Sequence, residues 1–106
     1  MVTLAEFKKL DLKIAEIEAV EPHPNADKLY VLRIRTGEAT KTLVAGIRPY
    51  YEESELVGKK IVIVDNLEPA TIRGVESQGM LLAASNSEML TLLVPEKDIP
   101  AGAAVR

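Results

Sequence analysis

The segment LYVLRIRTGEATKTLVAGI, residues 29–47, decides the fold. From residue 29 to 36 apolar side chains alternate with polar ones, which is the period-two pattern of a half-buried strand. Gly37 and Glu38 interrupt this alternation and suit a hairpin turn. We therefore predict two antiparallel strands, residues 29–36 and 40–47, joined by a short turn.

A longer strand is predicted before this hairpin, at about residues 12–21. The spacing from Ile14 to Ile17 is odd, whereas one face of a strand repeats every second residue. A bulge at residues 15–16 would restore the phase. The strand should end at Pro22, because proline cannot donate to a central ladder.

The remaining chain predicts a short helix and three further strands. The stretch YYEESELVG, residues 50–58, places glutamates ahead of a glycine, which indicates a helix that ends at a glycine cap. Residues 60–64 are apolar almost throughout and predict a fourth strand. A fifth is predicted at 80–84 after a long polar connection, and one more at 89–94 before an extended tail.

Three strands, a short helix and two strands, in that order, predict an all-β fold, a five-stranded Greek-key barrel of the OB type. A small sandwich is the alternative. We expect one domain, 1–106, with the barrel at about 11–86 and a C-terminal extension at about 87–106. The extension contains the apolar run MLTLLVP, which such a barrel does not need. It therefore predicts the interface of a homodimer.

Composition makes most enzyme classes improbable. The chain has no cysteine and a single histidine, His23, so disulfides, thiolate metal sites and histidine-rich metal sites are excluded. No glycine-rich phosphate loop or catalytic constellation appears. We therefore expect a non-catalytic chain that needs no cofactor and no metal. The N-terminus lacks an apolar run long enough for a signal peptide or a membrane span, so the expected location is the cytoplasm.

Positive charge concentrates around the central hairpin, although the whole chain carries a net charge of −3. Between residues 28 and 48 there are five cations and one anion, Glu38. The cations are Lys28, Arg33, Arg35, Lys41 and Arg48. They could displace counterions from a nucleic acid, or they could be ordinary solvated residues of a sheet. Because aromatic residues are few, a nucleic acid would be bound through its backbone and shape rather than by stacking.

Two further stretches carry a family resemblance, HPNADKLYVL at residues 23–32 and NLEPATIRGVESQGMLLAAS at 66–85. Together with LVAGI and LVGKKIVIV, in the same order, they resemble the tRNA-binding domain of methionyl-tRNA synthetases. That domain also occurs in free-standing tRNA-binding proteins and in the precursor of endothelial monocyte-activating polypeptide. The resemblance covers about residues 3–106 and is greatest to the C-terminal domain, or a separate β subunit, of archaeal or bacterial enzymes.

The resemblance implies an OB barrel that dimerises through its C-terminal extension and binds folded tRNA without reading bases closely. It also implies a synthetase catalytic region, fused or separate, as a partner. Carried over position by position, it implies tRNA contacts at Asn25, Lys28, Arg33, Asn66, Arg73, Ser77 and Met80. Arg35 and Lys41 join them from the charge pattern. Asparagine and serine can bond phosphate or sugar, and arginine neutralises phosphate. Met80 offers an adaptable apolar surface, with core packing as its alternative role.

The chain departs from the resembling family at Glu68 and Thr71, where many members carry lysine, and at Ala15, where glycine is common. Fewer cations beside the site should weaken tRNA binding, so that it is useful mainly when a second subunit or a catalytic body adds valency. Two other functions stay open. One is a dimerisation module with residual RNA binding, and the other is a protein-export chaperone of related fold.

Overall fold

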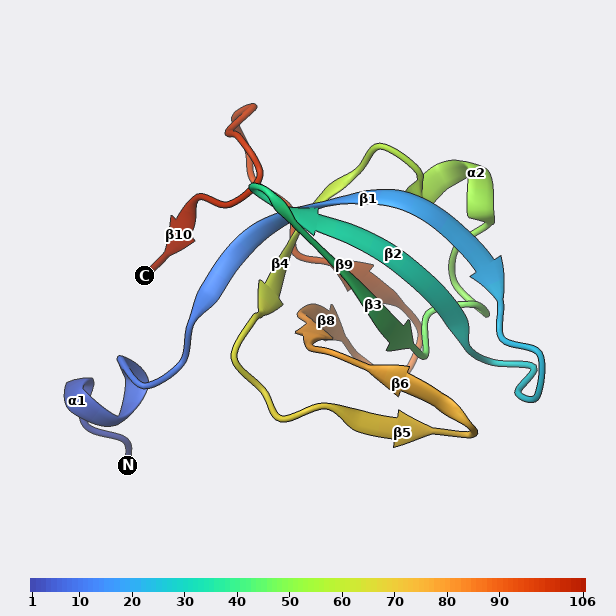
Figure 1. Ribbon diagram of the computed structural model, residues 1–106, viewed down its shortest axis with the longest axis horizontal. Coiled ribbons are helices and arrows are strands. Elements are labelled where there is room, and N and C mark those ends of the chain that lie inside the picture. Colours follow the sequence, from blue (N-terminus) through green and yellow to red (C-terminus); the bar gives the residue numbers. More distant parts are fainter.

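The computed structural model describes all 106 residues and contains ten strands and two short helices (Figure 1). The elements in chain order are α1 (Leu4–Phe7), β1 (Leu12–Pro22), β2 (Tyr30–Thr36), β3 (Ala39–Ala45), α2 (Glu53–Leu56), β4 (Lys60–Val64), β5 (Ala70–Ile72), β6 (Val75–Ser77), β7 (Met80–Leu81), β8 (Ala83–Ser85), β9 (Leu90–Leu92) and β10 (Ala104–Val105). None of the helices is long and apolar enough to cross a membrane.

The main sheet has six strands, in the order β3–β2–β1–β4–β7, with β10 beside the start of β1. All of its pairings are antiparallel. The first half of β1 pairs with β4 and its second half with β2, with Glu16 in both ladders. Because the long strand β1 pairs with two neighbouring strands in succession, the sheet curls into a half-barrel around a single apolar core (Figure 1).

The central hairpin follows the predicted alternation. Leu32 and Ile34 on β2 are completely buried, whereas Arg33 between them is exposed. The turn is the predicted one, since Thr36 pairs with Ala39 across the two intervening residues. The predicted third strand is shorter than expected and ends at Ala45 rather than residue 47.

The bulge in β1 lies at a different position from the one predicted. The register between β1 and β2 shifts between Ile17 and Ala19, at Glu18, and the pairing of β1 with β4 is regular through residues 15–16. The odd spacing in the sequence has another origin. Ile14 and Ala15 are consecutive and both buried, so both faces of the strand are covered at this point.

The predicted short helix is α2, a single turn that places Leu56 in the core. The chain then turns at Gly58, whose φ of +87° favours glycine, before it enters β4. The observed bounds of β4 are the predicted ones, residues 60–64.

The segment after β4 differs most from the prediction. The expected polar connection contains a hairpin, β5 with β6, whose turn is formed by Arg73 and Gly74. The expected single strand at 80–84 is two strands, because β7 pairs with β4 while β8 pairs with β9. Segments of two or three paired residues are too short to give a readable alternation, so the sequence pattern could not reveal them.

Contacts between β3 and the chain around β6 and β7 link the two edges of the half-barrel. Gln78 donates its backbone N–H to the carbonyl of Thr42 at 2.8 Å, and its Oε1 accepts the Thr42 N–H at 2.9 Å. Next to it, Gly79 passes so close to β4 that a Cβ would lie 2.9 Å from the carbonyl oxygen of Val64. The fold is thus the expected one, mostly β with an OB-type half-barrel and a short helix between β3 and β4.

The expected C-terminal extension packs on the barrel. Leu92 on β9 is only 4% exposed and belongs to the core cluster, and its backbone N–H donates to the Tyr51 hydroxyl at 3.1 Å. Further along, β10 pairs with β1, and Gly102 lies against the backbone of Gly37 in the β2–β3 turn. The boundary near residue 86 stays a prediction, but the residues beyond it contribute to the core.

Candidate nucleic-acid interface

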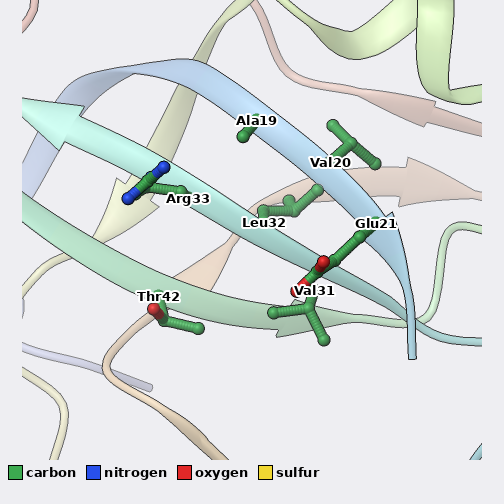
Figure 2. A pocket seen from close by; sticks show the side chains of 7 residues that line it. All are labelled: Ala19, Val20, Glu21, Val31, Leu32, Arg33 and Thr42. Carbon is green, nitrogen blue, oxygen red and sulfur yellow. The ribbon is translucent and has the colours of Figure 1, made fainter. Parts of the chain in front are cut away.

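The outer surface of β1, β2 and β3 carries a shallow hollow of about 270 Å³. It is lined by Ala19, Val20, Glu21, Val31, Leu32, Arg33 and Thr42. Figure 2 shows the Arg33 side chain toward one end of this group and Glu21 toward the other. Arg33 is exposed and has neither a salt bridge nor a hydrogen bond from its guanidinium. Its charge is therefore available to an anionic partner.

Arg35 forms ion pairs with residues of its own sheet. It lies on the same side of β2 as Arg33, as expected from the alternation, but its guanidinium lies 3.5 Å from Glu16 and 3.7 Å from Glu18. It also donates to the carbonyl of Gly37 at 2.8 Å. Two carboxylates balance this one cation, so Arg35 adds little free positive charge to the face.

Lys41 also forms an ion pair within the fold, in a cluster of charged residues around Asp65. Its Nζ donates to the Asp65 carboxylate at 2.7 Å and to the Asp65 carbonyl at 2.9 Å. Lys13 donates to the other carboxylate oxygen at 3.0 Å, and the Asp65 side chain is only 10% exposed. This cluster joins β1, β3 and the end of β4, and it takes Lys41 out of the free cationic surface.

These contacts shift the pKa values of Asp65 and Lys13. Burial by itself would raise the pKa of Asp65, but hydrogen bonds and positive charge from Lys41 and Lys13 outweigh it and hold that pKa below 3.8. The hydrogen bond and charge of Asp65 raise the pKa of Lys13 above 10.5. The folded state therefore favours the charged form of both groups.

Asp65→Asn is expected to destabilise the fold in a pH-dependent way. Because the folded pKa of Asp65 is depressed, its contribution is present above 3.8 and is lost as the pH falls through the folded value. At neutral pH the loss should be about 1–2 kcal/mol, since both lysines keep access to water. Urea unfolding at pH 7 and pH 3 checks this. A difference between variant and wild type that does not shrink at pH 3 would contradict it.

The 23–28 loop and the turn of the β5–β6 hairpin lie together. The Arg73 guanidinium donates to the carbonyl of Asn25 at 3.0 Å. His23, at 3% exposed, has one ring nitrogen 3.0 Å from the carbonyl of Ile72 and accepts the Asn25 N–H on the other at 2.9 Å. Lys28 is exposed in the same loop. The structure thus brings Asn25, Lys28 and Arg73 into one region.

Asn66 and Ser77 have structural partners. The Asn66 amide accepts the Asp11 N–H and donates to the carbonyl of Lys9, each at 2.8 Å, which ties the N-terminal segment to the end of β4. The Ser77 hydroxyl, 5% exposed, accepts the Val44 N–H at 3.0 Å and donates to the carbonyl of Gly79 at 3.1 Å. Both side chains shape the barrel rather than offer free polar groups.

Met80 lies on β7 opposite Val64 and is 49% exposed, so half of its surface is free for a ligand. The sequence did not predict the roles of His23, Asp65 and Gln78. Each is a single polar residue that bonds to a residue 24 or more positions away, and no local pattern marks such a pair. No three acidic or histidine side chains gather in a way that could hold a metal ion.

These features define a small OB-type barrel. Its distinctive feature is a surface on which cationic and polar groups are exposed. The chain belongs to the family described as "Putative tRNA binding domain", which it matches over residues 12–104. This confirms the resemblance seen in the HPNADKL and RGVESQGM stretches. The family is a tRNA-binding module and not a catalytic domain, in agreement with the prediction that the chain alone is no enzyme.

Relatives are found among full-length ligases and small solved proteins. The chain is 53% identical to the methionine–tRNA ligase of Pyrococcus furiosus over 105 residues, which is 99% of this chain and 14% of the ligase. A methionyl-tRNA synthetase-related protein from Pyrococcus horikoshii superposes with a TM-score of 0.93 at 34% identity and covers 100% of this chain and 98% of its own. The chaperone CsaA from Bacillus anthracis superposes with a TM-score of 0.92 at 28% identity, covering 100% and 99%.

Proposed function

We propose that the chain binds folded tRNA as an accessory domain of a cytoplasmic methionyl-tRNA synthetase, whose catalytic region is fused to it or separate. The observation that carries this proposal is the unpaired, exposed Arg33 on the sheet face of a chain that belongs to a tRNA-binding family. Lys28, Asn25 and Arg73 extend the surface at the neighbouring loop, and Met80 adds apolar contact. Arg35, Lys41, Asn66 and Ser77 support the surface through their contacts within the fold.

The positions of the aromatic residues favour recognition of tRNA by its shape rather than by base stacking. Tyr30 is buried and donates its hydroxyl to the carbonyl of Tyr51 at 2.7 Å, while the Tyr51 hydroxyl is occupied by Leu92. The Tyr30 ring therefore cannot stack on bases, and the partly buried Tyr51 ring has the Lys59 ammonium over it, 5.7 Å from its centroid. The exposed rings are Phe7 in α1 and Tyr50 between β3 and α2, so no row of rings follows the sheet face. Folded tRNA holds phosphates and 2′-hydroxyls at fixed spacing, so a rigid set of cations can engage them without ordering a flexible strand.

Competition between RNAs tests this proposal. Several unrelated tRNAs should bind with similar affinity at near-physiological salt, and each should compete better than an unstructured RNA of equal length. Filter binding or fluorescence anisotropy measures both. Equal competition by unstructured RNA would reduce the domain to a general polyanion binder, and strong preference for one tRNA would require base contacts.

A homodimer is the second part of the proposal. Met89, Leu93 and Val94 of the C-terminal extension are exposed even though Leu92 beside them is buried. Adjacent apolar side chains of this kind are typical of an interface, and a symmetric dimer is the commonest arrangement. Sedimentation at micromolar concentration should give about twice the chain mass of 11.6 kDa. A monomer at that concentration would reject this part and leave tRNA binding standing.

Polypeptide binding is the alternative function, favoured by the superposition on CsaA and by the partly apolar hollow beside Arg33. An unfolded polypeptide that displaced tRNA at comparable concentration would favour it. We rank tRNA binding first because the family match covers residues 12–104.

A further inference from the structure

Arg73 has an unusual backbone conformation. It is the one non-glycine residue with a positive φ, +53°, and the next residue, Gly74, has φ +92°. They form a two-residue turn, because Ile72 pairs with Val75 on either side. Such turns favour asparagine, aspartate or glycine, whereas a longer side chain in this conformation is strained. The strain persists only where surrounding contacts hold it, and it is a recurrent feature of functional sites.

Two contacts hold the turn, and both come from the 23–28 loop. The Arg73 guanidinium donates to the carbonyl of Asn25 at 3.0 Å. Directly before Arg73, the carbonyl of Ile72 lies 3.0 Å from Nε2 of His23. These contacts join positions 48 or 49 residues apart in the chain.

The partners of His23 determine where its proton lies. The Asn25 N–H can only donate, so Nδ1 accepts it, at 2.9 Å. The Ile72 carbonyl can only accept, so Nε2 must donate to it. The ring is therefore the uncharged tautomer with its proton on Nε2. Since the ring is almost fully buried and both nitrogens are bonded, it acts as a fixed link between loop and turn.

The Arg73 guanidinium has donors left over. Of its five N–H groups one is used by Asn25, and the residue is exposed without a carboxylate partner. A planar guanidinium fixed in this way can bind two oxygens of one phosphate. The positive charge of exposed Lys28, in the attached loop, adds to its attraction for an anion.

We propose that His23 is a positioning residue for RNA binding: by anchoring Ile72, it holds Arg73 in the strained conformation in which its guanidinium binds one phosphate of the RNA backbone. This inference rests on the proposed tRNA-binding function and adds to it one ligand group, one binding side chain and the residue that orients it.

A double-mutant cycle tests the link. His23→Asn retains an oxygen that can accept the Asn25 N–H but cannot reach Ile72, and Arg73→Ala removes the phosphate contact. We expect His23→Asn to weaken tRNA binding about three- to tenfold in the wild-type background and to have no further effect in the Arg73→Ala background. Arg73→Ala should also make the slope of log affinity against log salt shallower by about 0.7–0.9. Equal losses from His23→Asn in both backgrounds would mean that His23 only stabilises the fold, and would overturn the proposal.

A conservative variant provides a second comparison. In His23→Gln the amide nitrogen extends far enough to donate to the Ile72 carbonyl, so this variant should retain more tRNA affinity than His23→Asn. Thermal unfolding of both shows whether their stabilities match. If His23→Asn keeps the higher affinity at matched stability, the link to Ile72 is not what positions Arg73.

A measurement without RNA separates this inference from the proposed function. In the NMR spectrum of the free domain, the Arg73 Nη2–H that donates to the Asn25 carbonyl should be protected from exchange in the wild type, and this protection should be lost in His23→Asn. If wild type fails to bind tRNA but shows this difference, the proposed function is wrong while the anchoring is real. If wild type binds tRNA and the signal does not depend on His23, the positioning role is wrong.

Discussion

Arg33→Gln is expected to weaken tRNA binding on the order of tenfold at low salt, the largest effect of any single charge removal on the sheet face. Arg33 is the cation of β2 that no carboxylate neutralises, so its loss removes a complete phosphate contact. The slope of log affinity against log salt should become shallower by about 0.7–0.9. Titration with total tRNA at several salt concentrations measures both quantities.

Arg35→Gln is the matched control, because it changes the net charge equally on the same strand. Its guanidinium already neutralises Glu16 and Glu18, so the salt slope should stay close to the wild-type value. Any loss of affinity in this variant would come from the freed carboxylates acting at a distance. If both variants change the slope by the same amount, ion pairing within the sheet does not decide which arginine binds RNA. If neither variant changes the slope, the site lies on the 23–28 loop and the β5–β6 hairpin.

Removing residues 88–106 is expected to abolish the cooperative unfolding transition and leave an aggregating chain. The truncation takes Leu92 out of the core, leaves the Tyr51 hydroxyl without its donor and exposes the edge of β1 that β10 covers. One buried leucine alone accounts for about 2–5 kcal/mol. A small domain has only about 5–15 kcal/mol of total stability. Circular dichroism during thermal unfolding shows whether a transition remains.

Point substitutions separate the parts of this effect. Leu92→Ala should lose about 2–5 kcal/mol and remain folded. Val57→Ala is its control, because this aliphatic side chain is exposed, lies outside the proposed dimer interface and should lose well under half as much. If the truncated chain is a soluble, folded monomer, the extension is an independent dimerisation segment, and the core contacts of Leu92 are dispensable.

The fold could be predicted where the sequence contains long alternating or apolar segments. β2 and β4 appear in the structure within one residue of their expected bounds, because the regular alternation of β2 and the continuous apolar run of β4 are both clear patterns. The β5–β6 hairpin and the division between β7 and β8 were missed. Their two- or three-residue strands exist because of contacts with β3, β4 and β9, and none of those contacts is encoded locally.

For the candidate site, the sequence by itself determined which residues are charged and which side of β2 carries the two arginines, since strand alternation is a property of adjacent residues. Only the tertiary structure decided which cations remain free. Lys41 and Asp65 lie 24 residues apart, and the salt bridge between them forms only when the sheet curls and brings β3 to the end of β4. His23 likewise acquires its role when the β5–β6 turn meets the 23–28 loop. The residue type sets the charge of each side chain. Neutralisation of that charge requires an opposite charge within about 4 Å, and only the folded chain brings the two groups together.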